Sequence, residues 1–163
     1  MKGGVEAGAG GAGRPVGLLG RASILALVGG LAFWLANLAI SLTPVAAEYR
    51  AALGIAYVPM LIEALLGGLI VGFIVGYSML RLFGRIPTGG PLTKSLVLTT
   101  VVLVVATLAL EAPTKFLTAL SEPWRYFIIG TVFNVIRFVA LAVAVGSLYG
   151  RVDPRRTRTA RPR

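Results

Sequence analysis

The sequence predicts an all-α integral membrane protein, a four-transmembrane-helix bundle with both termini in the cytoplasm. Hydrophobic residues make up 56% and charged residues 13% of the 163 residues, whereas about 25% of the residues of a soluble domain are charged. Four apolar segments reach the roughly 20 residues that a helix needs to cross the hydrocarbon core of a bilayer. We place these spans at about 22–42, 55–81, 94–111 and 125–149.

The distribution of basic residues predicts the orientation of the spans. Of the 16 lysines and arginines, twelve lie in the N-terminal segment, in the loop between the second and third spans, or in the C-terminal tail. Three lie in the other two loops and one, Arg137, lies inside a span. Because cytoplasmic loops carry an excess of basic residues, we expect both termini on the cytoplasmic side of the plasma membrane.

Two segments flank the predicted transmembrane domain of residues 21–150. Residues 1–20 are rich in Gly and Ala and are predicted to be disordered. Residues 151–163 form a basic cytoplasmic tail, in which Arg155, Arg156 and Arg158 are expected to hold anionic lipid headgroups, at about 1 kcal/mol per basic residue. Nucleic-acid binding is not expected, since the positive charge is split among three segments without interleaved aromatic residues.

A signal peptide is the alternative interpretation of the first span, because residues 45–47 (Val-Ala-Ala) resemble a cleavage site. The apolar run of that span is longer than the 7–15 residues of a usual signal-peptide core. We therefore expect the first span to be retained.

Small residues recur at every fourth position in two of the spans. The second span carries Gly68, Gly72 and Gly76, and the fourth carries Ala142 and Gly146. Such stripes let the backbone of a neighbouring helix approach closely. They predict helix packing, either within one bundle or between the protomers of a homo-oligomer.

A few polar residues lie inside the spans and are expected to form one layer in the outer half of the bundle: Asn37, Glu63, Glu111, Asn134 and Arg137. A charge at the centre of a bilayer costs roughly 2.5–3.5 kcal/mol, so it needs a partner or a wet cavity. The layer is interpreted either as a hydrogen-bonded cluster that fixes the order of the helices or as a substrate or ion site that opens outward.

Glu63 is the candidate partner of Arg137, which shares a helix face with Asn134 and Gly130. At 1.5 Å per residue the two charged residues fall at similar heights. Pro59 leaves the pairing open, because proline suits the first position of a helix. A helix that begins there places Glu63 at the outer interface.

The chain has no cysteine and no histidine. It therefore has no thiolate nucleophile and no disulfide, and no imidazole to bind a metal or haem. The membrane-embedded residues also lack the paired acid and base that a hydrolytic site needs. We expect no enzymatic activity, no catalytic residue, no metal and no cofactor.

These observations predict a small polytopic membrane protein that acts as a non-enzymatic accessory subunit or assembly component of a membrane complex. Its expected partners are the lipid bilayer and either further copies of itself or other membrane subunits. One alternative is a small oligomeric transporter or channel with a polar site around Glu63 and Arg137. Another is a holin-like pore former, suggested by the small size and the basic tail.

Overall fold

All regular structure in the computed structural model, which describes residues 17–87 and 89–153, is helical. The elements in chain order are α1 (Leu18–Ser41), α2 (Pro44–Ala52), α3 (Tyr57–Leu82), α4 (Pro91–Ala106), the π-helical turn η1 (Thr107–Glu111), α5 (Ala112–Phe116) and α6 (Pro123–Val152). Four of these stretches are long and apolar enough to cross a membrane: α1, α3, the continuous run Pro91–Phe116, and α6. The predicted all-helical protein with four spans is therefore confirmed.

The observed boundaries differ most from the predicted ones at the start of the first span and at the end of the third. The first helix begins at Leu18, so residues 18–20 of the segment predicted to be disordered are helical. The third span continues five residues beyond Glu111, through α5 to Phe116. Residues 1–16 of the predicted N-terminal segment lie outside the described residues, as do the tail arginines Arg155, Arg156 and Arg158.

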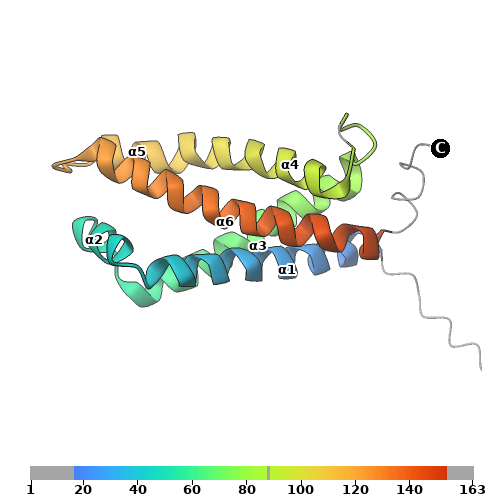
Figure 1. The fold of residues 1–163 in the computed structure, drawn as a ribbon, viewed down its shortest axis with the longest axis horizontal. Helices are drawn as coiled ribbons and strands as arrows, with labels where there is room; N and C mark the ends of the chain where they lie inside the picture. The colour runs from blue at the N-terminus through green and yellow to red at the C-terminus, as the bar shows by residue number, and fades with distance from the viewer. Residues whose placement is uncertain (1–16, 88, 154–163) are drawn as a thin grey trace, which may run out of the picture.

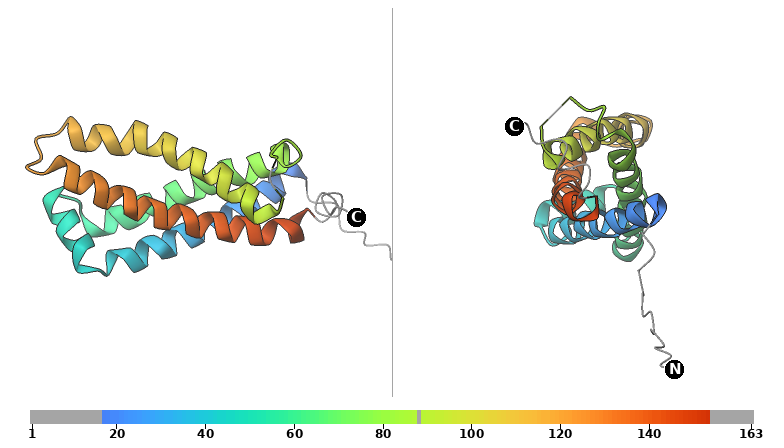
Figure 2. Two further views of the ribbon diagram at one scale, coloured as in Figure 1. Left: turned by 45° about the horizontal axis from the view of Figure 1, so that its top comes forward. Right: turned by 90° about the vertical axis from the view of Figure 1, so that its right-hand side faces the viewer.

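The four long helices form one elongated bundle (Figure 1). The start of α1 and the end of α6 lie at the same end of the bundle, where Arg21 pairs with Asp153 at 3.5 Å. We call the opposite end, where α2 and α5 lie, the distal end. The end-on view in Figure 2 shows α1 between α3 and α6, with α4 diagonally across from α1 and α3 diagonally across from α6.

The glycine stripe of α3 packs against α1. A methyl group on Gly72 would lie 2.8 Å from the carbonyl oxygen of Ala26, and one on Gly68 would lie 3.0 Å from the carbonyl oxygen of Gly30. Gly76 lies in the same way against Leu25. Only glycine allows two helix backbones to approach so closely, and the close approach supplies the van der Waals contact that joins helices in lipid.

The small residues of α6 face α4 rather than another chain. The Ser95 hydroxyl donates a hydrogen bond to the carbonyl oxygen of Ala142 at 2.9 Å. A methyl group on Gly146 would lie 2.7 Å from the Cα atom of Leu92. Both small-residue stripes that the sequence shows are therefore occupied by helices of the same chain.

The hydrophobic core fills the half of the bundle nearest the termini. Its fully buried members come from α1, α3 and α6, and include Leu25, Val75, Met79, Leu141 and Val145. The distal half is packed differently, because only a small cluster of buried apolar residues is found there. The polar residues of the spans gather in this less filled half.

Candidate functional site

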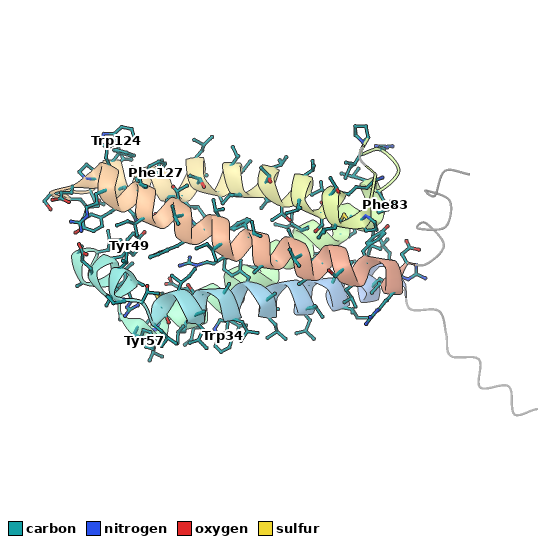
Figure 3. All side chains as sticks on the ribbon, in the orientation of Figure 1. Trp34, Tyr49, Tyr57, Phe83, Trp124 and Phe127 are labelled. Atoms are coloured by element: carbon teal, nitrogen blue, oxygen red, sulfur yellow. The ribbon has the colours of Figure 1, made fainter. Side chains whose placement is uncertain are left out.

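The short helix α2 closes the distal end of the bundle over α1 and α6. It begins at Pro44, and the Thr43 side chain accepts a hydrogen bond from the Ala46 backbone N–H at 3.2 Å. A threonine cap followed by proline at the first position is a strong start signal for a helix. The helix places Tyr49 between α2 and α6 (Figure 3). The Tyr49 ring packs edge-on against the ring of Phe133.

The π-helical turn η1 places Glu111 inside the bundle. In this turn the Ala112 backbone N–H bonds to the Thr107 carbonyl, five residues back. Pro113 follows directly; it has no N–H, and its ring clashes with a carbonyl in a regular α-helix. The wider turn relieves that conflict, so the helix continues instead of ending at Glu111. Single π-turns of this kind are frequent at functional sites.

Glu111 is the centre of a hydrogen-bonded network that joins α2, α5 and α6. The Tyr49 hydroxyl donates to one carboxylate oxygen at 2.9 Å, and Lys115 approaches the same oxygen at 3.3 Å. The Asn134 amide donates to the other oxygen at 3.3 Å, and Arg137 donates to the Asn134 side-chain oxygen at 3.2 Å. Three of the five polar residues that the sequence singles out are thus linked directly.

The close approach of Glu111 to α6 requires a glycine at position 130. A methyl group there would collide with the Glu111 carboxylate and would lie 2.7 Å from the Tyr49 hydroxyl oxygen. Burial, followed by the Glu111 charge, raises the pKa of Tyr49. The phenol therefore stays protonated and remains a hydrogen-bond donor to Glu111 over the ordinary pH range.

A cavity of about 570 Å³ lies beside this network in the distal half. It is bounded by α1, α2, α3, α5 and α6, and its volume falls within the range of about 300–1,000 Å³ that is usual for small-molecule sites. Its charged and polar lining residues are Asn37, Ser41, Tyr49, Arg50, Glu63, Glu111, Thr114, Lys115, Asn134 and Arg137. Its apolar lining includes Phe33, Ile40, Met60 and Phe133.

Two buried hydrogen-bond donors on the cavity wall have no partner in the described part of the chain. They are the side-chain nitrogen of Asn37, a residue that is 1% exposed, and the Nε atom of Arg137. An unpaired buried donor costs about 1–3 kcal/mol, so native proteins rarely leave one without a reason. Both residues belong to the cavity lining, Asn37 from α1 and Arg137 from α6.

Glu63 lines the same cavity from α3 and is exposed. Within residues 17–87 and 89–153 it forms no ion pair, so the structure does not bring it into contact with Arg137. It lies about 9 Å along the axis from the start of α3 at Tyr57, whereas Arg137 lies about 21 Å from the start of α6. All five residues of the predicted polar layer therefore reach the cavity region, but Glu63 stays apart from the network.

Sequence reasoning missed Tyr49, Arg50 and Lys115 as parts of this site. Arg50 donates to the Ser41 carbonyl at 3.0 Å and stacks over the Tyr57 ring at 5.0 Å. The Thr43-Pro44 pair is a helix-start signal that would have placed Tyr49 and Arg50 on a short helix beside the spans. No comparable signal marks Lys115, because the π-turn that carries it inward depends on tertiary packing.

The described residues contain no group of three or more aspartates, glutamates, histidines or cysteines that could hold a metal ion. The chemistry of the cavity is that of hydrogen-bond donors and acceptors and of separated charges.

The fold defines the class of the protein as a helical bundle with four helices long and apolar enough to span a membrane. Comparisons with protein-family models, with curated proteins and with solved structures found no match.

Proposed function

We propose that the protein is a small, non-enzymatic membrane transporter. Its distal cavity binds a ligand that carries an anionic group, and this binding is the first step of transport. The observation that carries this proposal is Arg137, a permanent cation in the middle of a span whose only hydrogen-bonded partner in the described chain is a neutral amide. Its buried Nε atom has no partner in the described chain, and the residue lines a cavity of ligand size.

A purely structural role explains these features less well. A polar cluster that only fixes the order of the helices gains stability by satisfying every buried member, since a partly satisfied network is worse than an apolar core. Here Glu111 has three polar partners, whereas the Nε atom of Arg137 and, outside the network, the side-chain nitrogen of Asn37 have none in the described chain. A bound carboxylate or phosphate supplies the acceptors that these donors lack, and arginine suits both groups.

The ligand reaches the cavity from the extracytoplasmic side in this proposal. The loops at the distal end carry three basic residues, whereas the other end carries twelve, and the positive-inside rule places the richer side in the cytoplasm. The plasma membrane is the bilayer that gives such a cavity access to external solutes.

The test uses ethyl phosphate and propionate as anionic probes. Dissociation constants are measured by saturation-transfer NMR on the full chain in uncharged maltoside micelles. Loss of a charge-assisted hydrogen bond costs about 1.5–3 kcal/mol, so Arg137→Gln should weaken binding about 10- to 150-fold. The matched control is Arg125→Gln, which removes an exposed arginine of the same helix that does not line the cavity. Absence of binding to the wild-type protein, or equal binding by both variants, would overturn the proposal.

An accessory subunit of a membrane complex is the second candidate. It is favoured by the large apolar surface of α3 and the third span, of which little is buried within the chain. Other subunits, further copies of the chain or lipid can cover such a surface. Native mass spectrometry of the same preparation separates these two roles. An accessory subunit carries a different protein in fixed stoichiometry, whereas a lone or homo-oligomeric species supports the ligand-binding role.

A further inference from the structure

Two side chains of opposite charge line the distal cavity without forming an ion pair in the described chain, Glu63 on α3 and Arg137 on α6. The two helices lie diagonally across the bundle from each other (Figure 2). The charges therefore come from opposite walls, with the cavity between them.

The other charges of the cavity are already engaged. Lys115 pairs with Glu111 at 3.3 Å, and Arg50 is held by the Ser41 carbonyl and the Tyr57 ring. These contacts leave Arg137 as the available cation in the interior and Glu63 as the available anion nearer the opening.

From this arrangement we propose that the ligand is a zwitterion, whose anionic group binds Arg137 and Asn37 while its primary ammonium group binds Glu63. This inference rests on the proposed function and narrows it to one ligand class. A ligand with a single anionic group engages the donors of α1 and α6 but leaves the Glu63 carboxylate facing it, and like charges repel. An ammonium group a few bonds from the ligand's anionic group would instead donate a charge-assisted hydrogen bond to the Glu63 carboxylate.

The helices α3 and α5 both contribute to the cavity lining but barely touch each other. Their distal ends lie apart in Figures 1 and 2. Glu63, on α3, is exposed. A free amino-acid-like solute and the headgroup of an ethanolamine phospholipid share the required chemistry, and the experiment separates the two sources.

The experiment compares pairs of probes that differ only in the amine: propionate against β-alanine, and ethyl phosphate against phosphoethanolamine. Binding is measured by saturation-transfer NMR on the full chain in maltoside micelles. We expect each zwitterion to bind about 3- to 10-fold more tightly than its anion, the effect of one partly exposed charge-assisted contact. Glu63→Gln should bring the ratio to about one, and the exposed control Glu122→Gln should leave it unchanged.

The outcomes of this experiment separate the inference from the proposed function. Equal binding of anion and zwitterion, or a preference that survives Glu63→Gln, would overturn the inference while leaving anion binding intact. If none of the four probes binds, the proposed function fails as well. Because Glu63 is exposed and makes no hydrogen bond or ion pair among the described residues, its substitution should leave the fold unchanged, which circular dichroism checks.

A second arm identifies the source of the zwitterion. The protein is reconstituted in nanodiscs that contain phosphatidylethanolamine and phosphatidylglycerol in equal amounts, and retained lipid is measured by native mass spectrometry. A lipid headgroup is supported if the protein preferentially retains phosphatidylethanolamine, if phosphoethanolamine displaces that lipid, and if Glu63→Gln abolishes its retention. Binding of the soluble zwitterions without such retention supports a free solute. Because the basic tail can also retain anionic lipid, the result that would overturn the zwitterion assignment is preferential retention of phosphatidylglycerol that Arg137→Gln abolishes.

Discussion

Substitution of Gly72 by alanine tests the helix packing that shapes the cavity. The added methyl group would lie 2.8 Å from the Ala26 carbonyl oxygen and 3.2 Å from both the Ala26 Cα atom and the Gly30 nitrogen. All three are backbone atoms, so no side chain can rotate away, and α1 and α3 must separate. Overpacking of this kind costs about 1–3 kcal/mol.

Gly67 offers a matched control on the same helix, because a methyl group there meets no atom within 4 Å. Both substitutions gain up to about 1 kcal/mol of helix propensity. The difference between the two variants therefore isolates the packing cost. We expect Gly72→Ala to be about 1–3 kcal/mol less stable than Gly67→Ala.

Reversible unfolding in mixed maltoside and dodecyl sulfate micelles measures this difference. Trp34 on α1 reports on the contact, because its indole nitrogen donates a hydrogen bond to the Leu61 carbonyl of α3 at 3.0 Å. Its fluorescence should change at lower dodecyl sulfate content in Gly72→Ala than in Gly67→Ala. Equal unfolding midpoints for the two variants would refute the close contact between α1 and α3.

Two further predictions concern the network and the orientation. Tyr49→Phe removes one hydrogen bond to a half-buried carboxylate and should lower the free energy of unfolding by about 1.5–3 kcal/mol, measured in the same micelles. An unchanged midpoint would show that Tyr49 does not support Glu111. The chain has no cysteine, so Ser121→Cys at the distal end and Gly84→Cys at the other end give single labelling sites, both exposed. In intact cells a membrane-impermeant maleimide should label only the distal cysteine, and the reverse pattern would contradict cytoplasmic termini.

The spans were predictable because length and apolar composition alone determine which segments can cross a bilayer. The C-terminal boundary of the third span was not predictable in the same way, because a charged residue followed closely by a proline is a usual signal for the end of a helix. In the structure the missing N–H of Pro113 falls beside a π-turn, so the helix passes through that point. Whether a proline ends a helix or is absorbed by a wider turn depends on what packs against it.

The polar residues of the spans were predictable as parts of the candidate site, but their contacts were not, and neither were the contributions of Tyr49, Arg50 and Lys115. Asn37, Glu111, Asn134 and Arg137 stand out because polar side chains are costly in lipid. Which of them meet depends on the rotation of each helix about its axis, and that rotation is set by packing such as that of Gly130 against Glu111. The heights of these residues along their helices therefore suggested a common polar layer but not which side chains contact each other.

The separation of Glu63 from Arg137 has a local reason. Pro59 is the third residue of α3, close to the position that the proline suggests for the helix start. Glu63 thus lies one to two turns from the distal end of its helix, whereas Arg137 lies near the middle of the 30-residue α6. The carboxylate is exposed there, which lowers the cost of leaving it without a pair in the free protein.

Substitution of Asn37 by leucine tests most directly whether the distal cavity is a binding site. The two side chains are similar in size, and the substitution removes a buried donor that has no partner in the described chain. If the cavity is a site, Asn37→Leu should keep or raise the stability of the ligand-free protein, by up to about 1–3 kcal/mol. The same variant should bind ethyl phosphate about 2- to 10-fold more weakly, as expected for one neutral hydrogen bond. A loss of stability with unchanged binding would contradict the account and identify the polar layer as a structural cluster.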